Sequence, residues 1–409
     1  MREQTLLTPL SVAQKTTYVE WETEPSLFKH YPDFCYRISI SEHPELEWIR
    51  EVRCVTEEKN LGGKPYRRLN VPSAGNLHPI EMYLQIRNVK GILSGIYHVD
   101  VLTGSLVLIH DIERDGLETA VGLNSRLNGF IVFFTLVPFR SAWKYGLRAW
   151  RYLYLDLGHQ IGAFLSVMDH FGLSLTKLSV DNTGSFNHLI GMGEDEFVAA
   201  AYAIGECSSK PAQPIDQALM HVSPCDYTLR NVVLNEAVAR EELYSGAIGY
   251  ATGYWNPVLN RTRRSAREFA GLMDDEVIRT IIAMDTPPSI EMVHIVFRAQ
   301  SMQCGVYRSG RCTEPGDMAD EVIHLLLGQR FITQAGMVSL VYAKRFDAQT
   351  HIDAGIAVQH LYMLTSHYRA GCSGIGAFYD EEASSWSKYP LIYAAAIGGT
   401  DESRGTERD

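Results

Sequence analysis

The chain has 409 residues, of which 46% are hydrophobic and 21% are charged, the proportions of an ordinary globular protein of two or three domains. Its formal net charge is −11 without a basic block, which argues against a nucleic-acid-binding or membrane-surface protein. The N-terminus has no apolar stretch of the kind that a signal peptide needs, so we expect a cytoplasmic protein.

The predicted elements of the first half are two strands followed by a long helix. Alternating apolar residues predict a strand at 81–87. The apolar run Phe130–Phe139 is too short to span a membrane, which takes about 20 residues, and indicates a second, buried strand at 129–137. Apolar residues at helical spacing follow, and Gly172 is a suitable end for that helix.

The second half repeats this order. Strands are predicted at 292–298 and 337–343, and a long amphipathic helix follows, with Gly371 as its expected end. Between the halves, the segment from Cys207 to Gly246 contains three prolines and little strand signal, which is typical of a connector.

Short motifs recur in the same order in both halves, and this indicates an internal duplication. We therefore expect a first half at 1–212, a connector at 213–246 and a second half at 247–409. The recurring pairs are IEMYL at 80–84 with IEMVH at 290–294, GIY at 95–97 with GVY at 305–307, Asp-x-Gly at 156–158 with 353–355, and AIG at 203–205 with 396–398.

A proline-flanked loop, VPSAGNLHP at 71–79, leads into the first strand. Ser73 and Asn76 supply a hydroxyl and an amide, and Gly75 permits close backbone approach, which would suit a flat heterocycle with several donors and acceptors. A simple turn before a strand explains the same residues.

Two motifs of the second half could bind an anion. Arg263, Ser265 and Arg267 share one face of either a helix or a strand, as a phosphate site requires, although a solvated basic turn has the same composition. The segment GCSGIGAF at 371–378 leaves backbone N–H groups accessible, or simply forms the loop that ends the long helix.

Lys144 and Tyr145 are adjacent and could transfer a proton if burial lowered the lysine pKa; a surface lysine beside a packed tyrosine is the alternative. The seven cysteines and 14 histidines contain no CxxC, HxxxH or HExxH pattern, so we expect reduced thiols and no metal site.

Taken together, these motifs resemble the FMN-dependent nitroreductase superfamily, and more closely its SagB-type (McbC-like) dehydrogenase branch. The resemblance covers nearly the whole chain. Its branch-specific motifs are FKHYP at 28–32, PSAGNLHPIEMYL at 72–84, GIYHVD at 95–100 and WKYGLRAWRYLYLDLGHQIGA at 143–163; RRSAR at 263–267 and GIGAF at 374–378 resemble the general nitroreductase pattern.

The resemblance implies an α+β fold, intertwined homodimers and FMN bound at the dimer interface. It implies that the flavin phosphate and pyrimidine contact Arg263, Ser265 and Arg267, that Gly374, Ile375 and Gly376 face the same flavin, and that Pro72, Ser73, Gly75 and Asn76 approach it from the other half.

The motifs are complementary between the halves. The segment 48–59 has no Arg-x-Ser-x-Arg, LSLTK at 173–177 replaces GIGAF, and Pro287-Pro-Ser289 is a shortened version of the loop. We therefore expect two tandem copies that form an intertwined single-chain pseudo-dimer with one intact flavin site and one degenerate site.

The branch oxidises thiazoline or oxazoline rings to azoles in peptide natural products, with a base that removes a ring proton while hydride passes to flavin N5. The resemblance assigns the proton steps to Lys144 and Tyr145, and implies a peptide or small-molecule substrate and other biosynthetic enzymes as partners. Two alternatives remain at this point: an NAD(P)H-dependent nitro- or quinone-reductase, and a non-catalytic scaffold of a peptide-modifying complex.

Overall fold

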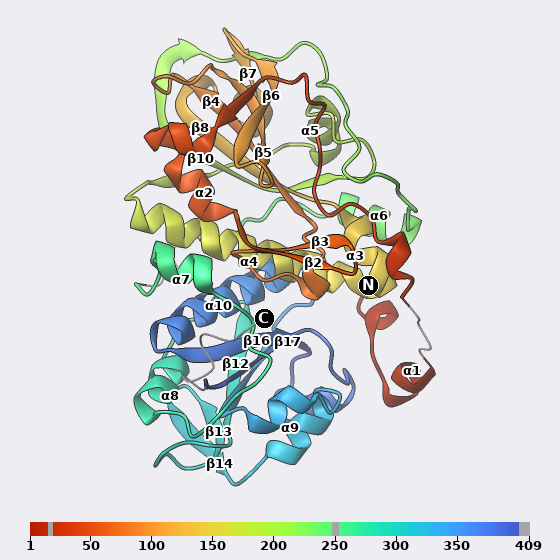
Figure 1. Ribbon diagram of the computed structural model, residues 1–409, viewed down its shortest axis with the longest axis vertical. Helices are drawn as coiled ribbons and strands as arrows, with labels where there is room; N and C mark the ends of the chain where they lie inside the picture. The colour runs from red at the N-terminus through yellow and green to blue at the C-terminus, as the bar shows by residue number, and fades with distance from the viewer. Residues whose placement is uncertain (15–18, 248–252, 401–409) are drawn as a thin grey trace. The chain divides into compact units, whose positions relative to one another are not determined.

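A computed structural model describes residues 1–14, 19–247 and 253–400, which form two compact units (Figure 1). The first unit consists of Val19–Gln160 and Phe164–Gly246, with Met1, and the second of Arg2–Tyr18, Ile161–Ala163 and Ala247–Asp409. The long helix α4 therefore belongs to the first unit except for three residues.

The first unit is built on a seven-stranded antiparallel sheet in the order β1-β6-β5-β4-β8-β10-β9. All eight residues of the central strand β4 are buried, and β4 pairs with β8 from Ile80↔Leu136 to Arg87↔Gly129. The strands are β1 (Arg37–Ser39), β4 (Ile80–Arg87), β5 (Gly95–Asp100), β6 (Ser105–Asp111), β8 (Ser125–Leu136), β9 (Leu175–Lys177) and β10 (Phe197–Pro211).

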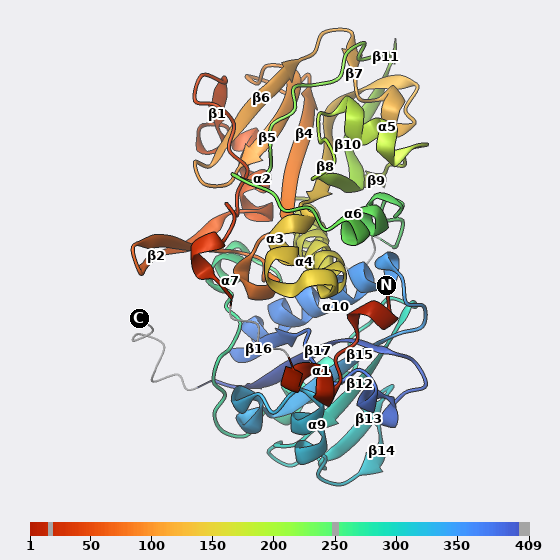
Figure 2. The ribbon, with the colours of Figure 1, turned by 90° about the vertical axis from the view of Figure 1, so that its right-hand side faces the viewer.

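Two strand pairs and five helices complete this unit, and α5 packs beside β10 (Figure 2). Proline at the first position of α3 starts that helix directly after β8, and Gly172, at φ +64°, follows the end of α4. The pairs are β2 (Val55–Leu61) with β3 (Lys64–Leu69), and β7 (Asp115–Gly116) with β11 (Gln213–Pro214); the helices are α2 (Glu47–Val52), α3 (Pro138–Tyr145), α4 (Ala149–His170), α5 (Thr183–Leu189) and α6 (Val232–Ala239).

The second unit has a six-stranded antiparallel sheet in the order β14-β13-β12-β15-β17-β16. Helix α10 packs against β16 and β17 (Figures 1 and 2). The elements are β12 (Ile290–Val296), β13 (Gly305–Arg308), β14 (Arg311–Pro315), β15 (Met337–Ala343), β16 (Ala370–Ile375), β17 (Leu391–Gly399), α1 (Pro9–Gln14), α7 (Pro257–Thr262), α8 (Asp275–Ile282), α9 (Ala319–Leu325) and α10 (Ala348–His367).

The two sheets have the same strand order: β6-β5-β4-β8-β10-β9 in the first corresponds to β14-β13-β12-β15-β17-β16 in the second. In each sheet the strand that begins with the IEM motif pairs with the strand that leads to the long helix. Each unit buries its own apolar cluster, with Phe133 and Ile131 in the first and Val338 and Leu340 in the second.

The strand predicted at 129–137 is β8, which ends at Leu136 because Pro138 starts α3. One prediction about these elements is wrong. Gly371 does not end the long helix: α10 ends at His367, Arg369 takes the left-handed turn at φ +56°, and the glycine-rich segment forms strand β16 instead of a loop.

Within the described ranges no helix is long and apolar enough to cross a membrane. The same residues contain no group of three His, Cys, Asp or Glu side chains placed to hold a metal ion. The seven cysteines all lie in the described part of the chain, and none of them forms a disulfide bond there.

Candidate functional site

The loop at 71–79 connects β3 to β4 and turns sharply. Gly75, Asn76 and His78 all have positive φ, at +65°, +61° and +45°. Glycine and asparagine tolerate this conformation better than other residues, which explains their presence at the turn. The peptide of Gly75 lies exposed on the outside of the loop.

Hydrogen bonds to neighbouring elements hold the loop. Ser73 Oγ donates to Asp156 Oδ2 of α4 at 2.6 Å, and the Ala74 N–H donates to the same carboxyl group at 3.1 Å. The Asn76 amide donates to the Arg67 carbonyl at 2.7 Å, and its oxygen lies 3.0 Å from His78 Nε2. The polar groups of Ser73 and Asn76 that we expected to contact a heterocycle are thus engaged within the protein, and the backbone around Pro72 and Gly75 forms the outer face.

The structure brings the predicted pair Lys144 and Tyr145 onto this loop. A Cβ atom at Gly75 would lie 2.6 Å from the Tyr145 hydroxyl and 3.2 Å from Lys144 Nζ. A side chain there would push these two groups aside, and the φ of +65° also favours glycine, so the loop and the end of α3 form one local site in the first unit.

The two side chains of the pair differ in environment. Burial, with Tyr152 and Asp156 nearby, raises the pKa of Tyr145, so its hydroxyl is protonated at neutral pH. A buried lysine was predicted, but Lys144 is only half-buried, because it lies in the last turn of α3. Its Nζ is 4.8 Å from the centre of the Trp21 ring, a cation–π contact that fixes the position of the side chain.

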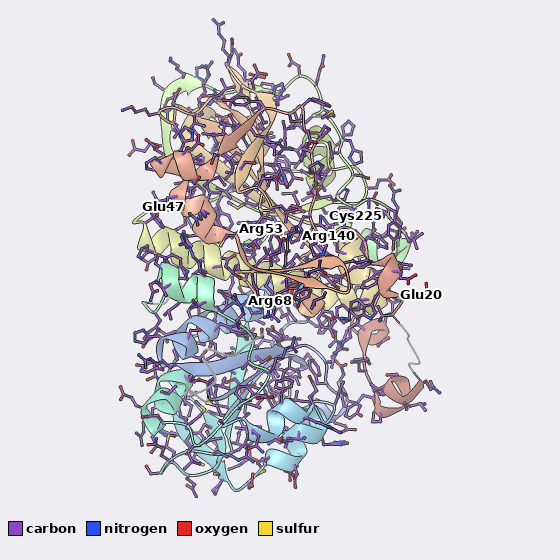
Figure 3. All side chains as sticks on the ribbon, viewed as in Figure 1. Glu20, Glu47, Arg53, Arg68, Arg140 and Cys225 are labelled. Atoms are coloured by element: carbon purple, nitrogen blue, oxygen red, sulfur yellow. The ribbon has the colours of Figure 1, made fainter. Side chains whose placement is uncertain are left out.

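Helix α3 is anchored by Arg140, which is fully buried (Figure 3). Its guanidinium lies 2.7 Å from Glu81 Oε1 of β4 and donates to the His78 carbonyl at 3.0 Å. Burial by itself would raise the pKa of Glu81, but Arg140 and His98 outweigh burial and lower it, so the pair is ionic. One buried ion pair thus fixes the Lys144 helix to both the sheet and the loop.

The second predicted set lies in the second unit, around Tyr362 of α10. Arg263 follows α7 directly and places its guanidinium 5.1 Å from the Tyr362 ring centre. Ser265 forms a β-bridge with Cys372 of β16, and its hydroxyl lies 2.9 Å from the Tyr362 hydroxyl. The Gly374 N–H donates to that same hydroxyl at 2.8 Å.

The remaining residues of this set are placed by β16. A Cβ atom at Gly374 would lie 2.1 Å from the Tyr393 hydroxyl, so this position also requires glycine. Ile375 is buried, Gly376 follows the strand, and Arg267 is exposed instead of sharing the buried position of Arg263. Because Gly374 donates its N–H to Tyr362, this group serves the internal structure of the strand.

Parts of each set recur in the other unit. Ser289, directly before β12, donates to Asp353 of α10 as Ser73 donates to Asp156. Arg53, labelled in Figure 3, follows α2 as Arg263 follows α7. Both arginines are buried. In contrast, β15 leads to α10 through Lys344–Asp347 alone, where the first unit inserts α3 between β8 and α4.

Sequence reasoning missed the residues that organise each set. Arg140 and Tyr362 lie in apolar helical stretches and carry no local signal. Asp156 was visible as part of the recurring Asp-x-Gly motif, but its contact with Ser73 depends on the fold.

The chain was compared with known proteins. No family model matches it. A candidate nitroreductase of Methanocaldococcus jannaschii is 34% identical over 95 residues, which are 22% of this chain and 46% of that protein. The chain therefore spans less than half the length of this curated relative.

Among solved structures, a candidate nitroreductase of Anabaena variabilis superimposes with a TM-score of 0.79 over 98% of both chains, at 19% sequence identity. The chain has the nitroreductase fold. This fold accounts for both units, since the likeness extends over nearly the whole chain. A chain of the Escherichia coli microcin synthetase McbBCD complex, solved with a truncated pro-peptide, matches 51% of this chain with a TM-score of only 0.33, too low to support a shared function.

Proposed function

We propose that the chain is an FMN-dependent oxidoreductase of the nitroreductase type. The observation that carries this proposal is the placement of Lys144 and Tyr145 directly over Gly75 of the loop that resembles a flavin-binding loop. The full-length likeness in fold and the partial sequence likeness to a candidate nitroreductase support it.

The residues present fit FMN. A buried guanidinium at Arg263 beside the Ser265 hydroxyl suits a phosphate or a pyrimidine oxygen. Gly75 and Gly374 each lie where a side chain would collide with a tyrosine hydroxyl, so the backbone can approach a flat ring closely. When bound, FMN would supply the two-electron acceptor.

The chain itself would handle the proton. Tyr145 retains its proton at neutral pH and therefore acts as a hydrogen-bond donor or acid at its hydroxyl. Lys144, after losing a proton to solvent, would accept one at Nζ, and Trp21 orients it. Arg140 keeps both groups over the loop.

We propose further that the reaction is the oxidation of a thiazoline- or oxazoline-type ring in a peptide natural product, as in SagB-type dehydrogenases. The WKYG motif at 143–146 supports this assignment, because it resembles the pattern of that branch. The structure places Lys144 and Tyr145 of the motif on α3, and the second unit has no corresponding helix between β15 and α10. A peptide substrate and other enzymes of a biosynthetic pathway would be its partners.

We propose also that the chain arose by tandem duplication, with halves at 1–212 and 247–409 joined by 213–246, and that it forms a pseudo-dimer with one flavin site. The equal strand order of the two sheets and the Ser–Asp pair in each unit support the duplication. In the sequence, PSAGN and WKYG occur only in the first half and Arg-x-Ser-x-Arg and GIGAF only in the second, which supports a single site.

The first test is the visible spectrum of the purified full-length chain, with released FMN quantified per folded chain. We expect flavin absorption and a ratio near one, by the single-site argument above. A colourless protein that does not bind added FMN would contradict the flavin assignment and favour a scaffold role.

The second test concerns the pair on α3. With a thiazoline-containing peptide, Lys144→Ala and Tyr145→Phe should each reduce turnover by about 100-fold, the usual contribution of a general acid or base, while FMN stays bound. Lys344→Ala is the matched control. The Lys344 Nζ donates to the Pro288 carbonyl in the second unit, so this variant should leave turnover unchanged. Full turnover in both α3 variants would refute their role, and rapid flavin bleaching by NADPH without peptide oxidation would favour a reductase.

A further inference from the structure

Asp156 is a buried carboxyl group that the proposed reaction does not use. It lies on α4 with 5% of its surface exposed, and its hydrogen bonds to the loop come from Ser73 Oγ at 2.6 Å and the Ala74 N–H at 3.1 and 3.2 Å. Ser73 Oγ also accepts the His78 N–H at 3.0 Å, so the carboxyl group is connected to both ends of the left-handed turn.

The turn that Asp156 holds is the part of the loop nearest the proton-transfer pair. Gly75 and Asn76 lie between the two residues that the network fixes, and the Gly75 backbone lies beneath Tyr145 and Lys144. If the network opened, the backbone would lose this close placement, because positive φ values at two successive residues persist only when neighbouring contacts hold them.

We propose that Asp156 is the positioning residue of this site: it holds the 72–76 loop in the conformation that receives the flavin and faces Lys144 and Tyr145. The inference rests on the proposed function for the identity of the ligand, but the hold on the loop is a property of the chain alone.

The protonation state of Asp156 sets the strength of this hold. Burial raises its pKa to about 7, against the bonds from Ser73 and Ala74, which lower it. If release of the loop exposes Asp156 to water, the pKa of its carboxyl group returns to about 4. Protonation therefore favours the held loop, and the hold weakens as pH rises from about 4 to about 7.

The loop at 71–79 and the helices α3 and α4 contain other titratable groups. They are His78 in the loop, Lys144 and Tyr145 on α3, Arg148 directly before α4, and Tyr152 and His159 on α4. Burial also raises the pKa of Tyr145, so its hydroxyl does not titrate between pH 5 and 8. Substitution of Asp156 itself separates its contribution from that of the two histidines.

The test uses the full-length protein with FMN. The dissociation constant for FMN is measured by flavin fluorescence from pH 5.5 to 8.5 for wild type, Asp156→Ala, Asp156→Asn and the matched control Asp353→Asn, whose carboxyl group accepts from Ser289 in the other unit. We expect Asp156→Ala to bind about tenfold more weakly, the effect of about 1.4 kcal/mol, because the Ala74 N–H and the Ser73 hydroxyl lose their partner.

Asp156→Asn is the rescue variant, because a neutral amide can accept from Ala74 and donate to Ser73 Oγ at every pH. It should bind FMN about as well as wild type at pH 6 and show a flat profile where wild-type affinity falls with pH. Asp353→Asn should keep the wild-type affinity and profile. Wild-type binding in Asp156→Ala, or an equal loss in Asp353→Asn, would overturn the proposal.

Amide hydrogen exchange of the FMN-free protein separates this inference from the proposed function. The Ala74 and His78 amides should exchange about tenfold faster in Asp156→Ala while the β4 amides stay protected, which shows a folded sheet with a released loop. If wild type binds no FMN, the flavin assignment fails and this measurement still decides the role of Asp156; unchanged protection at Ala74 would refute it.

Discussion

Each of the two groups of candidate site residues, the 71–79 loop in the first unit and the residues around Arg263 in the second, is held together by one buried polar side chain. Tyr362 uses its hydroxyl to connect Ser265 with the Gly374 N–H and its ring to face Arg263. Asp156 uses its carboxyl group to connect Ser73 with Ala74. Buried groups of this kind are costly to leave unpaired, so their loss should affect a defined neighbourhood.

Removal of the Tyr362 hydroxyl should weaken FMN binding. Tyr362→Phe leaves the Gly374 N–H and Ser265 without this partner, which costs about 1–3 kcal/mol and should lower FMN affinity about tenfold in fluorescence titrations. The control is Tyr342→Phe, another buried tyrosine of the same unit, whose hydroxyl donates to the Ala383 carbonyl at 3.0 Å. It should lose stability but keep its FMN affinity; equal affinities of wild type and Tyr362→Phe would contradict this role.

Asp156 should also make the stability of the FMN-free protein depend on pH. Its pKa is raised to about 7 in the folded state, so the folded protein binds more protons than the unfolded chain between about pH 4 and 7. The stabilisation is fully present below pH 4 and is lost as pH rises to 7. Compared with wild type, Asp156→Asn should therefore gain unfolding free energy between pH 5 and 8 in urea titrations, and parallel pH profiles for the two proteins would refute this.

Among the elements, α3 shows how a short helix is fixed in place. Eight residues cannot form a stable helix alone, so tertiary contacts must hold α3. Arg140, at its third residue, pairs with Glu81 and bonds the His78 carbonyl, while Lys144 and Tyr145 occupy its last turn. One end of the helix is therefore an anchor, and the other end holds the two residues proposed for proton transfer.

Loss of this anchor should destabilise the protein strongly. Arg140→Met leaves the Glu81 carboxylate buried without its main cation, which costs about 3–5 kcal/mol of unfolding free energy in urea denaturation. Arg67→Met, which removes a partly exposed pair with Glu58, should cost less than about 1 kcal/mol. The double variant Glu81→Gln with Arg140→Met should recover part of the loss, and a loss in Arg140→Met no larger than in Arg67→Met would argue against the anchor.

The strands rich in β-branched residues were predictable from the sequence, and β16 was not. Met337–Ala343 alternates strong β-formers and forms β15 with the predicted bounds. Strand β16 contains Gly371 and Gly374, which resemble loop residues, yet these glycines exist because Ala266 and Tyr393 occupy the space of a side chain. The composition of such a strand is determined by long-range neighbours, which periodicity does not reveal.

The candidate site was likewise predictable only in part. The motifs at 72–76 and 144–145 were visible in the sequence, and the structure of the first unit places them together. The residues that hold them, Asp156 and Arg140, bond partners more than 60 residues away in sequence, which no local pattern reveals. The hydrogen bonds that Ser73 and Asn76 form within the protein, to Asp156 and to the Arg67 carbonyl, were not predictable from the sequence; their contacts with a ligand stay a prediction.

For the whole molecule, the single-site proposal makes a sharp prediction about FMN content. Arg263→Ala and Gly75→Ala should each remove essentially all FMN from the purified chain, because the sequence contains each of the two proposed flavin-binding motifs only once. Arg53→Lys, at the corresponding position after α2, should retain one FMN per chain. Retention of half of the flavin in either loss variant would indicate two independent sites.

The proposed duplication, which the equal strand order of the two sheets supports, would have an evolutionary consequence. In a homodimer every substitution appears twice, so a change that improves one catalytic centre is also imposed on the other. A chain that carries both copies of the fold can vary each copy separately: β15 passes to α10 through four residues, while α3 fills the same interval after β8. Fusion of the copies into one gene would thus allow an asymmetric binding surface to evolve, matched to a substrate that itself has no twofold symmetry.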